Sequence, residues 1–95
     1  MDEETIKATY EIAENYFVGR NGYIRNYTKA AQLFQKLANN DHMISKSMLG
    51  MCYFKGQGVK MDRKKARELF QSSKNVDLSD YVLAAMDYFG IETKK

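Results

Sequence analysis

LGMCYFKGQGVKMDRKKARELF, residues 49–70, decides the fold of this 95-residue chain. Apolar and small residues recur every three to four positions on either side of a short segment that contains Gly56 and Gly58, which predicts two helices joined by a tight turn. Gly56 stands where a residue with positive φ would end the first helix, and Asp62 is placed to cap the second by accepting from a backbone amide. The stretch therefore predicts a helical hairpin.

The same pattern occurs on both sides of this hairpin. A shift of 36 residues aligns identical residues of two copies, namely Lys29, Ala30, Leu33, Phe34 and Gln35 with Lys65, Ala66, Leu69, Phe70 and Gln71. A shift of 35 aligns the start of a third copy, placing Met51, Tyr53 and Phe54 on Met86, Tyr88 and Phe89. We therefore expect two and a half repeats.

The repeats predict an all-α chain with five helices near 3–18, 27–39, 43–55, 63–74 and 78–89. Repeat 1 covers about 3–39, repeat 2 about 43–75, and a half-repeat capping helix about 78–89, all within a single domain, 1–95. Because one hairpin cannot bury its own apolar face, neighbouring hairpins must stack. Small residues at one helical position, Ala13, Gly50 and Ala85, would let adjacent backbones approach closely.

With these repeats, the chain resembles the Sel-one-like repeat (SLR) family, a relative of the tetratricopeptide repeats. The resemblance is strongest in repeat 2, at Leu49-Gly50, Tyr53, Gly56, Gly58-Val59, Asp62, Lys65-Ala66 and Leu69-Phe70. Repeat 1 departs from the pattern with Ile12-Ala13, Tyr23 and Asn26, and the third copy keeps Tyr88 and little else. The resemblance implies a short right-handed α/α solenoid that acts as a non-catalytic adaptor and binds a protein or peptide on its inner, concave surface.

Composition and charge exclude several classes of function. The net charge of +3 is too small to argue for nucleic acid, and one Cys and one His provide no zinc site. Cys52 lies on the predicted packing face, which indicates a buried, inert thiol. We expect a non-enzyme without metal or cofactor. The acidic N-terminal residues, and the absence of a long apolar stretch, predict a cytoplasmic protein without a membrane span.

A candidate binding surface follows from the side of each first helix opposite the packing face. Its residues would form a concave stripe of Tyr10, Glu14, Ser47, Met51, Val82 and Met86. In this stripe Glu14 would contact the polar groups of a bound partner. Methionine-rich and aromatic surfaces suit a bound peptide or helix. Residues at this spacing also serve as core, so both interpretations stay open for the apolar members, while core is favoured for Phe17, Phe54 and Phe89.

A second candidate surface is basic. Its members, Lys60, Arg63, Lys64 and Arg67, stand within a short segment in which Asp62 is the one acid. A solvated helix face is the favoured interpretation, with an acidic protein partner second. We do not expect nucleic acid there, because no aromatic residues are interleaved for base stacking.

Two alternatives to the adaptor hypothesis belong to other functional classes. A small single domain with a basic face is compatible with a stoichiometric inhibitor, such as an immunity or antitoxin protein. The apolar helix at 78–89 is compatible with a structural homodimer.

Overall fold

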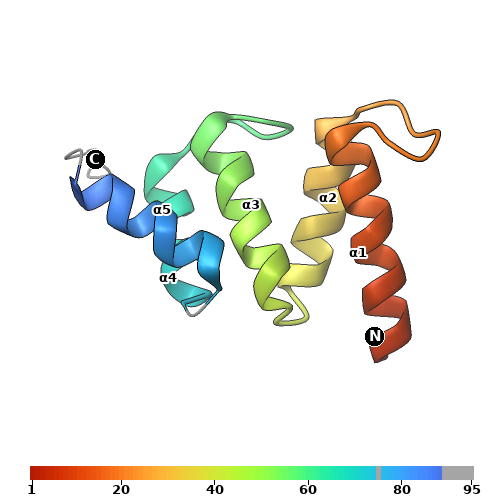
Figure 1. Ribbon diagram of the computed structural model, residues 1–95, viewed down its shortest axis with the longest axis horizontal. Coiled ribbons are helices and arrows are strands. Elements are labelled where there is room, and N and C mark those ends of the chain that lie inside the picture. The colour runs from red at the N-terminus through yellow and green to blue at the C-terminus, as the bar shows by residue number, and fades with distance from the viewer. Residues whose placement is uncertain (75, 89–95) are drawn as a thin grey trace.

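Five helices make up the chain in the computed structural model, which describes residues 1–74 and 76–88 (Figure 1). They are α1 (Glu3–Val18), α2 (Tyr27–Ala38), α3 (Met43–Lys55), α4 (Arg63–Ser72) and α5 (Asp77–Tyr88). No strand occurs in this part of the chain. The all-α prediction is confirmed, and the described helix ends lie within two residues of the predicted ones.

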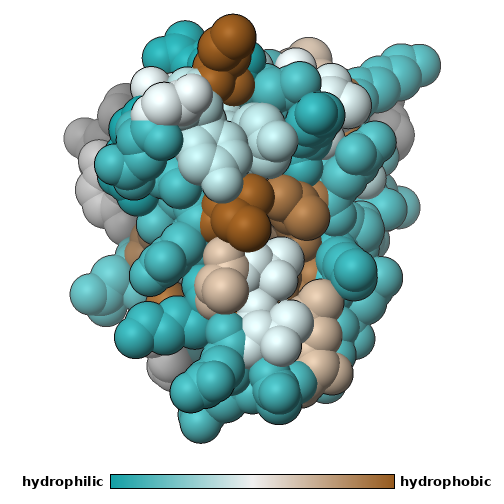
Figure 2. Space-filling model, turned by 90° about the vertical axis from the view of Figure 1, so that its right-hand side faces the viewer, coloured by the Kyte–Doolittle hydropathy of each residue, from teal (hydrophilic) through white to brown (hydrophobic). Residues whose placement is uncertain are grey.

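Each helix packs against the next along the chain, α1 on α2, α2 on α3, α3 on α4 and α4 on α5. The hairpins follow one another along the longest of the three axes, which measure 38, 26 and 20 Å (Figure 1). This arrangement is the predicted short helical solenoid. Helix α1 forms one end of the stack, and Figure 2 shows a small hydrophobic patch near the centre of that end, among neutral and hydrophilic side chains.

Side-chain caps and left-handed glycines set the helix boundaries. The carboxylate of Asp62 accepts from the Lys65 amide at 3.0 Å, and the Asn26 side chain accepts from the Lys29 amide at 3.0 Å. Gly56 ends α3 with φ 71°. This left-handed conformation costs glycine nothing sterically, because glycine has no Cβ atom. The predicted turn chemistry is therefore confirmed at both hairpins.

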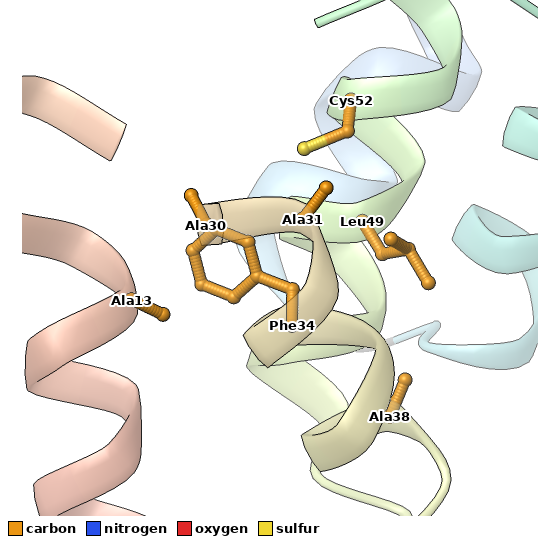
Figure 3. Close-up of a cluster of buried hydrophobic side chains, with 7 residues drawn as sticks. All are labelled: Ala13, Ala30, Ala31, Phe34, Ala38, Leu49 and Cys52. Atoms are coloured by element: carbon orange, nitrogen blue, oxygen red, sulfur yellow. The ribbon is translucent and has the colours of Figure 1, made fainter. Parts of the chain in front are cut away.

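The main core lies where α1, α2 and α3 meet. It is a cluster of buried side chains, Ala13, Ala30, Ala31, Phe34, Ala38, Leu49 and Cys52 (Figure 3). Phe34 is its largest member, and its ring lies near the rings of Tyr10 and Phe17, with centroids 5.9 and 6.0 Å away. The alanines around Phe34 let the three helices approach closely enough to enclose one aromatic ring.

A smaller core joins α3, α4 and α5. Its buried residues are Ala66, Phe70 and Met86, with Met51, Tyr53, Phe54, Val82 and Leu83 packed around them. A Cβ atom added at Gly50 would lie 2.7 Å from Cε1 of Phe70. The small residue at this position therefore makes room for an aromatic ring of its own hairpin, not for the backbone of a neighbouring repeat.

Gly50→Leu is expected to destabilise the chain by about 1–3 kcal/mol, because the new side chain overpacks the ring of Phe70. Urea unfolding followed by circular dichroism measures this loss. Gly50→Leu combined with Phe70→Ala should cost less than the sum of the two single changes, since the shortened residue frees the space. If the two losses of stability simply added in the double variant, the Phe70 ring would not contact the new leucine side chain.

Candidate functional site

The structure separates the members of the predicted concave stripe. Tyr10 is half-buried in the first hairpin, with its ring 5.3 Å from that of His42. Burial raises the pKa of the Tyr10 hydroxyl, and its hydrogen bond with Glu14 raises this pKa further. Glu14 also pairs with Arg20 at 3.1 Å. Both residues are engaged within the first hairpin, and their role toward a partner stays a prediction.

Two members of the stripe belong to the interior, which corrects the prediction that they line a contact surface. Met86 is 1% exposed and lies in the core with Phe70. Ser47 is fully buried and hydrogen-bonded to Ser79 and, at 3.3 Å, to Ser73. Ser73 and Ser79 are themselves 2.8 Å apart. The small α5 hydroxyl at Ser79 lets α5 cover this position, so neither residue is accessible to a partner.

Val82 is partly buried against the same core. The described part of α5 thus turns an apolar face inward, towards Phe70. Phe89, part of the apolar end assigned to dimerisation, lies outside the described residues. Homodimerisation through this helix stays a prediction.

Met51 is the stripe member that lines a groove. This cavity of about 410 Å³ is bordered by α1, α3 and α5, and we refer to it as the α1–α3–α5 groove. Its lining residues are Phe17, Val18, Arg25, Tyr27, Met48, Met51, Lys55, Gln57 and Leu78. They come from α1, the first residue of α2, α3, α5 and the two loops that close the hairpins. The groove therefore combines an apolar floor, which includes Met48 and Met51, with polar side chains at Arg25, Lys55 and Gln57.

The charges around the α1–α3–α5 groove have one sign. Arg25 and Lys55 are both exposed, and no acidic residue belongs to the described lining. The Arg25 guanidinium lies 5.5 Å from the centre of the Tyr27 ring. This cation–π contact orients the guanidinium at the groove. Two cations beside an apolar floor attract an anionic group on an apolar ligand.

Sequence patterns missed much of this groove. Arg25 and Gln57 reach the groove from loops and Tyr27 from the first residue of α2, and periodicity along a helix does not predict where residues in a loop or at a helix end lie. Helical spacing places Met48 on the packing face, yet this residue borders both the main core and the groove. The shift of 36 residues that aligns the two copies also aligns Gly22 with Gly58. This alignment was the available signal, because equivalent hairpin loops are expected at the same edge of a stack of repeats.

The predicted basic surface is divided in the structure. Arg63 lies over the Phe54 ring, 4.6 Å from its centre, whereas Arg67 lines a separate cavity between α4 and α5 together with Asp80. Lys60 and Lys64 are exposed. Arg63 and Arg67 thus have different neighbours, and a binding role for the four residues stays a prediction.

The cysteine and the histidine of the chain both have pKa values shifted by burial. Burial raises the pKa of the Cys52 thiol to about 11. Burial also lowers the pKa of His42, whose Nδ1 atom lies 2.7 Å from the Ser45 hydroxyl. Within the described ranges, no three His, Cys, Asp or Glu residues are grouped so that they could hold a metal ion.

Cys52 is expected to react with iodoacetamide about 100-fold more slowly in the folded chain than in urea at pH 8, since the thiolate is the reactive form and the raised pKa depletes it by that factor. Mass spectrometry measures the labelling rate. The folded rate should increase as the pH rises towards the pKa of the buried thiol. Equal rates with and without urea would contradict the buried position.

Comparison with known proteins assigns the family. The Sel1 repeat model matches residues 6–42 and 45–75, which together are more than half of the chain. The chain belongs to the Sel1 repeat family. Sel1 repeat proteins are generally protein–protein interaction modules and non-catalytic scaffolds. A search of curated proteins finds no match.

Two solved structures share the fold of this Sel1 repeat chain. One is a Sel1 repeat protein from Oxalobacter formigenes, with a TM-score of 0.86 and 20% identity over 100% of this chain and 40% of that one. The other is a protective antigen of uropathogenic Escherichia coli that displays an SLR fold, with a TM-score of 0.81 and 23% identity. It is matched by 90% of this chain over 18% of its own length. The chain thus spans less than half of each.

None of the described helices is long and apolar enough to cross a membrane.

Proposed function

We propose that this Sel1 repeat chain is an adaptor that binds a peptide segment of a partner protein in the α1–α3–α5 groove. The observation that carries the proposal is a ligand-sized cavity bordered by α1, α3 and α5. A site that draws on these three helices needs more than one hairpin. Binding is therefore a property of the solenoid and not of a single hairpin.

The chemistry of the groove supports an apolar anchor. Met48 and Met51 have unbranched, polarisable side chains that adapt to different shapes, and Phe17 and Tyr27 add flat aromatic surfaces. Arg25 and Lys55 supply positive charge beside this floor. The peptide that fits best carries one or two large apolar side chains next to an aspartate or glutamate.

Selection from a displayed library of random peptides tests the proposal directly. Full-length chain is immobilised, and bound peptides are sequenced after washing at low and at moderate salt. We expect enrichment of peptides that combine leucine, phenylalanine or methionine with an acidic residue. Enrichment of acidic peptides without an apolar residue would instead favour the basic residues of α4, and an unenriched library would contradict the proposal.

Met51→Glu should weaken binding of a selected peptide by about 10-fold or more, because it places a charge in an apolar groove. Met61→Glu is the matched control, since Met61 is 55% exposed and outside the groove lining. Isothermal titration calorimetry measures both affinities, and circular dichroism checks that both variants fold. Equal weakening in the two variants, or no weakening in either, would remove the groove as the site.

Lys55→Glu should weaken the same peptide and flatten the dependence of its affinity on salt, because the charge pair with the peptide is lost. Lys64→Glu, on α4, is the control for the change in net charge. Titrations at two salt concentrations distinguish the variants. An identical effect of both changes would indicate a general effect of charge.

A further inference from the structure

The two hairpin loops, residues 19–26 and 56–62, emerge at the same edge of the stack, the upper edge in Figure 1, which we call the loop edge. Each loop presents a large apolar side chain to solvent, since Ile24 is 85% exposed and Met61 is 55% exposed. Neither residue belongs to a core cluster or to the lining of the α1–α3–α5 groove. In Figure 2, hydrophobic atoms protrude at this upper edge, above neutral and hydrophilic side chains. The fold and the groove thus leave Ile24 and Met61 unused.

A cation stands beside each of these apolar residues. The shift of 36 residues that aligns the two repeats places Ile24 on Lys60 and Arg25 on Met61. All four side chains are exposed. The two loop tips therefore carry the same pair of residue types in opposite order, and an apolar side chain next to a cation is a feature of both repeats.

Equivalent backbone hydrogen bonds fix the base of each loop. The Asn26 amide donates to the Tyr16 carbonyl of α1 at 2.8 Å, and the Asp62 amide donates to the Tyr53 carbonyl of α3 at 2.9 Å. Each loop is thus fastened to the first helix of its own hairpin just after its tip. A tip that is already held in place loses little conformational freedom when it binds.

The charges of the chain are separated between the loop edge and the opposite edge. Exposed cations at or next to the loop edge are Arg20, Arg25, Lys55, Lys60, Arg63 and Lys64. They are offset in part by Asp62, whose carboxylate accepts from the Lys65 amide, and by Glu14, which pairs with Arg20. The opposite edge, where α1, α3 and α5 begin, carries Asp2, Glu3, Glu4, Asp41, Asp77 and Asp80. The loop edge is therefore the positive end of the molecule.

We propose that the loop edge binds the surface of an anionic lipid membrane, with Ile24 and Met61 entering the boundary between headgroups and acyl chains. At that depth, the neighbouring Arg25 and Lys60 lie level with the lipid phosphates. Apolar side chains beside Lys and Arg bind to such boundaries, and an anionic lipid surface attracts the cations from a distance. This contact needs no helix that spans the bilayer, and it does not depend on peptide binding in the groove.

The arrangement of the apolar residues favours a membrane over an acidic protein as the partner. A protein interface gathers its apolar residues in a central core surrounded by a polar rim. At the loop edge, Ile24 and Met61 stand on two separate loops, each with a cation as its neighbour in the sequence. A lipid surface accepts separate apolar anchors, because each one enters the boundary on its own.

A tryptophan placed at the loop edge reports insertion directly, because the chain has no Trp of its own. Ile24→Trp is titrated with vesicles of phosphatidylcholine alone and with vesicles that contain about one third phosphatidylglycerol. Ile44→Trp is the matched control, since Ile44 is 47% exposed at the start of α3, on the acidic edge. We expect a blue shift of the fluorescence for Ile24→Trp with the anionic vesicles alone, and none for Ile44→Trp. Equal shifts of the two variants, or equal shifts with both kinds of vesicle, would overturn the proposal.

Cosedimentation with the anionic vesicles separates insertion from attraction by charge. Ile24→Ser should weaken binding by about 10-fold, because an apolar side chain leaves the lipid boundary, whereas Ile44→Ser should not. Lys60→Gln should weaken binding at low salt and have less effect at high salt. Circular dichroism checks that each variant folds. Loss of binding with Lys60→Gln but not with Ile24→Ser would overturn the proposal, because the loop edge would then recognise negative charge alone, as on an acidic protein.

Discussion

Gly58→Ala is expected to cost about 3 kcal/mol or more of the free energy of unfolding, because two effects combine at this position. Gly58 has φ 78°. For a residue with a Cβ atom, this left-handed conformation is less favourable by about 1–2 kcal/mol of free energy. The methyl group would also press into the backbone of Tyr27 and Thr28. Overpacking of this kind costs about 1–3 kcal/mol. Backbone atoms cannot rotate away, so the two hairpins must move apart.

Gly22→Ala is the matched control for Gly58→Ala. It imposes the same conformational cost at φ 83°, yet the space around it is open. We therefore expect a loss of about 1–2 kcal/mol from this change, since only the conformational cost remains. Urea unfolding of both variants separates the two effects. Equal losses would show that the loop around Gly58 does not rest on α2, and the account of the repeat interface would be wrong.

Phe34→Ala is expected to cost about 3–5 kcal/mol, the usual range for removing a buried aromatic ring. The ring is fully buried in the cluster that contains Ala13 and Ala30, and it lies near the rings of Tyr10 and Phe17. The neighbouring alanines on the packed helices are too short to fill the space that the ring leaves. A chain of this size has roughly 5–14 kcal/mol of stability in total, so the loss is a large share of it.

Thermal melting followed by circular dichroism measures the effect of Phe34→Ala. Phe34→Leu is the control, because it keeps most of the buried volume and should lose less. A melting temperature that Phe34→Ala leaves unchanged would mean that α1 and α3 do not enclose this ring. Release of α1 alone, with α3 and α4 still folded, would agree with stacking in which each hairpin contacts only its neighbours.

Much of the fold was predictable from the sequence because residues within each repeat mark where its helices begin and end. The caps at Asn26 and Asp62 and the left-handed Gly56 are local devices, and each acts within a few residues of its position in the chain. The role of Gly58 is different. Its contact with Tyr27 joins segments of two different repeats, and no local pattern distinguishes it from Gly22.

The candidate site was less predictable for a similar reason. Helical spacing placed Ser47, Met51 and Met86 on one stripe, but it could not show which neighbour covers each of them. The serines Ser73 and Ser79 cover Ser47, the core around Phe70 covers Met86, and Met51 alone of the three lines the groove. Arg25 reaches the groove from a loop, where spacing along a helix gives no information.

The central claim is that a peptide binds in the α1–α3–α5 groove, and amide chemical shifts of the isotopically labelled chain test it most directly. A selected peptide that combines an apolar with an acidic residue is titrated into the full-length protein. We expect the largest shifts at groove residues such as Val18, Met51, Lys55 and Leu78. Shifts concentrated at Lys60, Lys64 and the rest of the basic segment, with the groove unchanged, would contradict it.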